Sequence, residues 1–373
     1  MANRTVDYGP LSHQILDVSL NVRHGDRVWI SGWDHTTELV SHLGRECEKR
    51  GCNVTTTLHS EASWLRSLKN GPLSRLERLT PNQKAMLEEA DSYIFTLGPR
   101  HPIDWRGIPP ERRSLATVWL LENNSFVKEW KSIAAKRGTK MLGIEATRAT
   151  KEWAKALDID FTNYARSMYD GCLADSQTMA NQARRLSPVL SKKSAVRITT
   201  RTGTDLRFKL DERPVEVSHG LVTDEEAENG RVVFLPSGAV GTTVDEESAE
   251  GVISYDQPIL SWKGRIEGLK IRVKGGRVTE YAASRGVGIF EEYLDSNGPD
   301  ANRFAFFGLG LNPMLKRGYT QDDKVLGSTE LNFGENESRG GKNRGGRNFW
   351  GTVSDADVTV GVRTIAKSGK LVI

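Results

Sequence analysis

Hydrophobic residues in the first half of the chain recur at helical spacing between short apolar runs. Residues 11–22 form an apolar helix face, and residues 27–30 form a short buried-strand signal. Asp34 is a candidate N-cap for a helix that Gly51 closes, and another strand pattern follows. Because helices and strands keep alternating to about Leu157, we expect a parallel sheet with helices on both faces.

From residue 195 the period of the pattern changes from 3.6 to 2. Turn residues separate pairs of alternating runs, as at Gly275-Gly276, so this half is expected to be mainly antiparallel β. A long helix over 163–186, stopped by Pro188, is expected to join the halves. The sequence therefore predicts an α/β domain at 1–188 and a β-rich domain at 189–373.

Composition is that of a folded protein, with 27% charged and 37% hydrophobic residues. The 52 Lys and Arg exceed the 48 Asp and Glu by too little to predict a nucleic-acid partner. The Gly- and Arg-rich run at 339–347 superficially resembles an RNA-binding segment, but it lacks interleaved aromatics and is expected to be a loop. Three cysteines without a metal or redox spacing indicate reduced thiols.

The chain begins without an apolar signal region and contains no run long enough to cross a bilayer. We therefore expect a cytoplasmic protein that contacts no membrane.

The segment 327–352 is informative about function because of the residue types that it lacks. It contains a strand pattern at 328–333 and a long loop, but no His, Cys or Asp. Its carboxylates are Glu330, Glu335 and Glu337, and every His of the chain lies before residue 220. The segment therefore cannot supply imidazole or thiolate ligands to a transition metal.

Motifs spread along the chain resemble those of the aminopeptidase T family of dinuclear metallopeptidases. They include FLPSGAV, FGLGLNP, LNFGEN and the loop GG-KNR, in that order. The resemblance implies an α/β domain followed by a β-rich catalytic domain, and a homodimer whose cleft the neighbouring chain helps to close. The segment 308–313 is then interpreted as a turn-rich loop of the family and not as a phosphate loop.

The resemblance also locates the family's five metal ligands, and here the sequence departs from the pattern. The corresponding positions are Ala239, Phe306, Glu330, Asn348 and Trp350. Only Glu330 keeps a carboxylate and Asn348 a neutral oxygen, whereas a two-metal site needs about three protein donors for each ion. We expect no bound metal and no other cofactor.

These replacements favour a non-catalytic peptide-binding protein in which Phe306, Phe349 and Trp350 form an aromatic floor. A basic loop would pair with acidic groups of the peptide, through Arg339, Lys342, Arg344 and Arg347. The class it resembles is the peptide-binding proteins of crocagin-type pathways, which implies that it presents a ribosomally made precursor to modifying enzymes. The plainer alternative is that the aromatics only fill space and the loop is solvated surface.

Other hypotheses stay open at this point. Glu330 and Asn348 could serve a metal-independent enzyme as general base and oxyanion donor. The chain could instead be a structural subunit that pairs with a pathway enzyme. Asp322, Asp323 and Glu330 could form a Mg²⁺ or Ca²⁺ site, although acidic residues in a loop are expected to be solvated. Residues 33–35 could bind a ligand at the sheet edge, or act as a cap and packing group.

Overall fold

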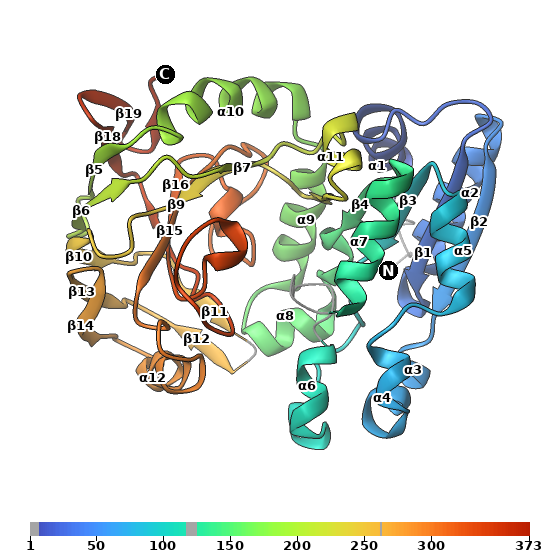
Figure 1. The fold of residues 1–373 in the computed structure, drawn as a ribbon, viewed down its shortest axis with the longest axis horizontal. Helices are drawn as coiled ribbons and strands as arrows, with labels where there is room; N and C mark the ends of the chain where they lie inside the picture. Colours follow the sequence, from blue (N-terminus) through green and yellow to red (C-terminus); the bar gives the residue numbers. More distant parts are fainter. Residues whose placement is uncertain (1–6, 117–124, 262) are drawn as a thin grey trace. The chain divides into compact units, whose positions relative to one another are not determined.

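The computed structural model describes residues 7–116, 125–261 and 263–373 (Figure 1). The chain divides into two compact units. Unit 1 comprises Met1–Ala154, Phe161–Leu173 and Gly220–Pro236, and unit 2 comprises Lys155–Asp160, Ala174–His219 and Ser237–Ile373. This division differs from the single boundary that we predicted after residue 188, because the chain enters unit 2 at Lys155 and returns to unit 1 for two segments, Phe161–Leu173 and Gly220–Pro236. Among the described residues, no helix is long and apolar enough to cross a membrane.

Unit 1 is built on a five-stranded sheet in which every pairing is parallel. Its strands are, in spatial order, β2 (Asn53–His59), β1 (Arg27–Trp33), β3 (Ser92–Thr96), β4 (Lys140–Ile144) and β8 (Val232–Leu235). The predicted parallel α/β fold is therefore confirmed. The last strand comes from the region expected to be β-rich, because a four-residue strand gives no sign in the sequence of which sheet it joins.

Helices cover both faces of this sheet, so it has two separate hydrophobic cores. Alternate strand residues point to opposite faces: Ile30 belongs to one core and Trp29 to the other. The helices are α1 (Gly9–His13), α2 (Thr37–Lys49), α3 (Glu61–Asn70), α4 (Leu73–Leu76), α5 (Pro81–Glu89), α6 (Pro110–Ala116), α7 (Ser125–Arg137), α9 (Phe161–Cys172) and α11 (Asp224–Glu228). Helix α8 (Lys151–Leu157) begins in unit 1 and ends in unit 2.

The long helix predicted over 163–186 is two helices, α9 and α10 (Ser176–Leu190). Asp175 starts the second helix because its Oδ1 accepts hydrogen bonds from the N–H groups of Gln177 at 3.0 Å and Thr178 at 3.3 Å. The prediction that Pro188 stops the helix was also wrong, since Pro188 lies inside the last turn of α10.

Unit 2 contains two larger sheets, and all of their pairings are antiparallel, as predicted. The eight-stranded sheet has the order β14 (Arg277–Ala282), β13 (Lys270–Lys274), β10 (Glu250–Ser254), β6 (Asp205–Leu210), β5 (Ser194–Thr199), β18 (Asp357–Val360), β19 (Arg363–Lys367) and β20 (Lys370–Leu371). The five-stranded sheet has the order β17 (Thr352–Ser354), β16 (Ser328–Phe333), β15 (Phe304–Gly310), β9 (Ala239–Thr243) and β7 (Val215–Ser218). A small third sheet pairs β11 (Ile259–Ser261) with β12 (Gly264–Ile266).

One hydrophobic core joins the two larger sheets of unit 2 with α10 and α12 (Val287–Ser296). The large sheet contributes Phe208, the five-stranded sheet contributes Phe307 and Leu331, and the helices contribute Leu186 and Phe290. The five-stranded sheet therefore has one face in the core, and the residues between its core positions point to the opposite face.

The interpretation of residues 308–313 as a turn-rich loop was wrong for its first half, because β15 continues to Gly310. Glycine is needed there for close packing, since a Cβ at Gly310 would overlap the carbonyl group of Val325. The glycines that suggested a loop in the sequence are thus required by the neighbours of a buried strand.

Candidate functional site

The candidate site lies on the face of the five-stranded sheet that points away from the core. Phe307 and Leu331 are core residues, so Phe306 and Glu330, one position earlier on β15 and β16, point to the opposite face. Glu330 pairs with Gly308 on one side and with Thr352 on the other. Strand period and register therefore bring together positions that are far apart in the sequence.

Glu330 is the central ionisable group of this face. Its side chain is buried, with 4% of the residue exposed, and its Oε1 accepts a hydrogen bond from Asn332 Nδ2 at 2.5 Å. Burial and then the nearby Asp323 raise the pKa of Glu330 to about 8. A carboxyl group in this environment holds its proton at neutral pH, and it can act as a proton donor or acceptor in that range.

A cavity of about 130 Å³ opens beside Glu330. Apolar side chains form one part of its lining, carboxyl groups a second and aromatic rings a third. The lining residues are Pro258, Ile259, Leu260, Tyr319, Thr320, Asp322, Asp323, Glu330, Trp350, Gly351 and Thr352. The cavity therefore offers both an apolar surface and an acidic one.

Asp322 is the second buried carboxyl group of the cavity, and only 8% of the residue is exposed. Its carboxylate accepts hydrogen bonds from the N–H groups of Gly318 at 2.9 Å and Tyr319 at 3.1 Å. Burial nevertheless raises the pKa of Asp322 to about 7, because it outweighs these bonds. The expectation that these loop carboxylates are solvated was therefore wrong for Asp322.

Six positions were predicted to form the peptide site in place of the family's metals: Ala239, Phe306, Glu330, Asn348, Phe349 and Trp350. Two of them, Glu330 and Trp350, line the cavity. Phe306 is buried elsewhere on the same face, over Gly241, where a Cβ would lie 2.5 Å from its Cζ atom. Ala239 is half-buried at the start of β9 and lies outside the cavity lining.

The expected aromatic floor does not form as predicted, because Phe349 belongs to the core of unit 2. Its ring lies 4.6 Å from that of Phe290 and 5.2 Å from that of Tyr293, measured between centroids. Asn348 Oδ1 is buried and has no hydrogen-bond partner among the described residues, and the partner of Glu330 is Asn332. Of the three adjacent positions, Trp350 alone reaches the cavity, and 47% of it is exposed.

Among the four cations of the predicted basic loop, Arg339 lies nearest the site. Its guanidinium lies 4.9 Å from the Phe306 ring centroid and 5.5 Å from that of Trp350, and it pairs with Glu216 at 3.5 Å. Arg344 pairs instead with Glu337 at 3.3 Å. Lys342 and Arg347 are exposed.

A buried ion pair between Arg213 and Glu246, which lie in connections between strands, anchors the basic loop. Arg213 binds Glu246 through two hydrogen bonds of 2.5 and 2.8 Å, and Glu246 also accepts bonds from Asn336 Nδ2 at 3.0 Å and the Lys342 N–H at 2.7 Å. Burial alone would raise the pKa of Glu246, but these bonds lower it to about 2. The loop is therefore fixed by a fully hydrogen-bonded charge and not only by its glycines.

The donors at the site do not fit a pair of divalent metal ions. Ala239, Phe306 and Trp350 carry no metal-binding atom, and Glu330 offers a carboxyl group with a raised pKa. Among the described residues, no group of three or more His, Cys, Asp or Glu is arranged to hold a metal ion.

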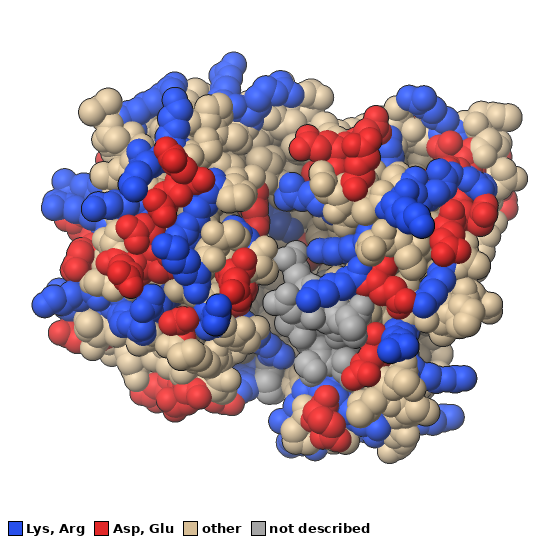
Figure 2. Space-filling view, in the orientation of Figure 1, with Lys and Arg blue, Asp and Glu red and all other residues tan. Residues whose placement is uncertain are grey.

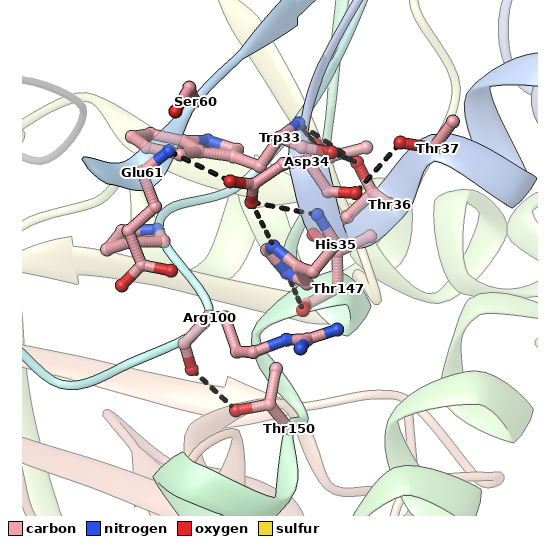
Figure 3. A network of polar contacts seen from close by, with 12 residues as sticks. Trp33, Asp34, His35, Thr36, Thr37, Ser60, Glu61, Arg100, Thr147 and Thr150 are labelled. Atoms are coloured by element: carbon pink, nitrogen blue, oxygen red, sulfur yellow. Dashed lines mark hydrogen bonds and ion pairs between the residues drawn. The ribbon is translucent and has the colours of Figure 1, made fainter. Parts of the chain in front are cut away.

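The cluster at residues 33–35 in unit 1 acts as a cap and packing group (Figure 3). Asp34 accepts hydrogen bonds from the backbone N–H groups of His35 at 2.9 Å and Glu61 at 3.1 Å, which lie at the starts of two helical segments. Trp33 is buried and packs edge-on against Trp64, with ring centroids 5.4 Å apart. The Asp34 carboxylate is therefore used by the backbone, whereas His35 Nδ1 is buried without a hydrogen-bond partner among the described residues.

The fold and the site define a two-unit protein of the aminopeptidase T type. The profile of the thermophilic metalloprotease (M29) family matches residues 10–311, and the chain belongs to this family. No curated protein matches the sequence.

Two solved structures share the fold over nearly the whole of both chains. Wild-type AmpT from Thermus thermophilus is 16% identical with a TM-score of 0.69, covering 97% of this chain and 98% of its own. The 2,5-dihydroxypyridine dioxygenase from Pseudomonas putida KT2440 is 17% identical with a TM-score of 0.64, covering 99% and 98%. Because one of these two proteins is a dioxygenase and the matching family is one of metalloproteases, the shared fold does not identify the reaction or ligand of this chain.

Sequence reasoning missed the wall of the cavity that faces Glu330. Ile259 and Leu260 come from the short strand β11, and Tyr319 comes from a loop before Asp322. A three-residue strand leaves almost no periodic signal, so nothing in the sequence linked these residues to Glu330. The pair Asp322 and Asp323 was noticed as a possible ligand set, and the structure places it beside Glu330 in one cavity.

Proposed function

We propose that this protein binds a peptide at the cavity beside Glu330 and does not hydrolyse it. The observation that carries the proposal is that Glu330 and Trp350 line one cavity at positions where the family resemblance expects metal ligands. An indole takes the place of a metal-binding side chain, and a half-exposed Trp beside an apolar wall is a typical anchor for a ligand side chain.

The surface around the cavity is consistent with a polar, extended ligand. Arg339, Lys342, Arg344 and Arg347 provide cations on one loop. On the face of the molecule shown in Figure 2, Lys and Arg are interspersed with Asp and Glu. A guanidinium that already pairs with Glu216 can exchange that partner for a peptide carboxylate. In this proposal the peptide is a ribosomally made precursor, presented to modifying enzymes as in crocagin-type pathways, and the protein works as a homodimer.

One observation favours a second candidate, a metal-independent enzyme that acts on a peptide or small molecule. The raised pKa of Glu330, about 8, is the value expected for a general acid or base near neutral pH. The predicted oxyanion donor Asn348 is not the hydrogen-bond partner of Glu330, which weakens the arrangement that the sequence suggested.

The test combines metal analysis, turnover and ligand capture on the full chain. Purified protein is assayed for bound zinc, cobalt and manganese, and then incubated with these metals and a panel of aminoacyl substrates. Full-length protein is also used to capture peptides from its native producer, followed by mass spectrometry. Retention of defined peptides without hydrolysis supports the proposal. Stoichiometric metal with release of amino acids would overturn it, and metal-independent turnover lost in Glu330→Gln would establish the second candidate.

A further inference from the structure

In the cavity beside Glu330, one oxygen of the carboxyl group has no hydrogen-bond donor among the described residues. Oε1 of Glu330 accepts the Asn332 bond, and no hydrogen bond from the described residues reaches Oε2. The side chain is more than nine-tenths buried and forms part of the cavity lining. An acceptor oxygen that borders an open volume can take a hydrogen bond from a ligand that brings a donor.

The charges around this oxygen determine whether the donor group of the ligand should be cationic, neutral or anionic. The negative charges of Asp323 and Glu216 favour the protonated form of Glu330, and the positive charge of Arg339 favours its ionised form. Counting Glu330 itself, three carboxyl groups face one guanidinium. The guanidinium of Arg339 is already paired with Glu216 and stacked on two aromatic rings. The local field therefore favours a positively charged group over a neutral or negative one.

The remaining walls are suited to an alkyl chain that carries such a charge. Ile259 and Leu260 provide apolar surface, and the rings of Tyr319 and Trp350 provide faces for a cation. The volume of about 130 Å³ is close to that of a protein cavity of about 150 Å³ that binds one benzene molecule, so the cavity has room for one side chain.

Resting on the peptide-binding function proposed above, we infer that this cavity receives a cationic side chain, Lys or Arg, of the bound peptide. The charged head donates a hydrogen bond to Glu330 Oε2, which a carboxyl group accepts in either protonation state. The stem lies along Ile259 and Leu260, and the Trp350 ring covers it. The site thus selects one residue of the peptide by the charge and length of its side chain.

The experiment begins with a random library of twelve-residue peptides, N-acetylated and C-amidated, incubated with the full-length protein. Peptides that are retained are sequenced by mass spectrometry, and we expect Lys or Arg to be enriched at one position. The best peptide is then synthesised with Lys, Arg or norleucine at that position and titrated by calorimetry. A charged hydrogen bond in a buried site should make the better cationic peptide bind at least tenfold more tightly than the norleucine peptide.

Each outcome separates this inference from the function on which it rests. If no peptide is retained, both are overturned. If peptides are retained but norleucine binds as well as Lys and Arg, only the cationic pocket is overturned. A norleucine peptide with a free N-terminus that matches the Lys peptide would assign the cavity to a terminal amine, which also overturns the inference.

Two variants locate the effect at this cavity. Glu330→Gln should abolish the tenfold preference for the cationic peptide over norleucine, because the amide keeps the shape but cannot ionise when a cation binds beside it. Glu280→Gln replaces a carboxyl group by an amide in the same way at an exposed residue of β14 and should keep the preference. If Glu330→Gln fails to fold, the comparison of Lys, Arg and norleucine peptides on the unchanged protein still decides the question.

Discussion

Gly308 on β15 faces Glu330 on β16, and a Cβ at position 308 would lie 2.8 Å from Glu330 Oε2. The same Cβ would lie 3.1 Å from Cε1 of Phe306. The bare backbone at this point leaves room for both the carboxyl group and the ring. The position of Glu330 therefore depends on a missing side chain in the neighbouring strand.

Gly308→Ala should lower the free energy of unfolding by about 1–3 kcal/mol, because the added methyl group must displace buried neighbours. It should also weaken the binding of a cationic peptide, because the Oε2 atom moves. Chemical unfolding and peptide titration measure the two effects. Gly288→Ala in α12 is the control: its nearest neighbour is 3.9 Å away, and alanine suits a helix better than glycine. Equal stability of both variants would show that the close approach is not rigid.

Phe349 and Trp350 are adjacent in sequence but should respond to substitution in opposite ways. Phe349→Ala should cost about 3–5 kcal/mol of folding stability, since it empties part of the core. Trp350→Ala should cost about 1 kcal/mol or less, because the ring is half-exposed, yet weaken peptide binding about tenfold or more. Thermal unfolding and calorimetric titration of both variants test this. A core-sized loss of stability in Trp350→Ala would contradict the assignment.

Among the ion pairs described in unit 2, disrupting the one between Arg213 and Glu246 should lower the free energy of unfolding most. Arg213→Met leaves the Glu246 carboxylate buried without its cation, so we expect a loss of about 3–5 kcal/mol in urea unfolding. Adding Glu246→Gln should recover part of that loss, because the amide removes the charge and its Oε1 still accepts from Asn336 and the Lys342 N–H. A double variant no more stable than the single one would argue against an electrostatic cause.

Stability should fall as pH rises through the neutral range because of Asp322. Its pKa is raised from 3.8 to about 7, so between these values the unfolded chain releases a proton that the folded chain keeps. The stability that this group contributes is complete below about pH 4 and lost above about pH 7, with a magnitude on the order of 4 kcal/mol.

Asp322→Asn tests this pH dependence, because the amide oxygen still accepts from Gly318 and Tyr319 but does not titrate. Urea unfolding at pH 5 and pH 8 should show the variant gaining on the unchanged protein at the higher pH. Glu280→Gln, at an exposed side chain, should follow the unchanged protein. Parallel pH curves for all three proteins would contradict the raised pKa.

The sequence by itself determined the two kinds of sheet and the absence of imidazole around residue 330. Side-chain periods of 3.6 and 2 are local properties of the chain, so they survive without tertiary information. The same holds for the strand at β16 and for the replacement of family ligands at Ala239, Phe306 and Trp350, since residue identity needs no coordinates.

Only the tertiary structure decided which of those residues share a cavity. Phe349 points into the core and Trp350 out of it, and Asp322 and Ile259 reach Glu330 from separate loops and strands. The raised pKa values of Glu330 and Asp322 follow from burial, which depends on contacts between segments many residues apart. The residue types predicted an apolar, aromatic pocket, whereas the cavity carries several carboxyl groups. Strand register and side-chain direction determine which groups line it.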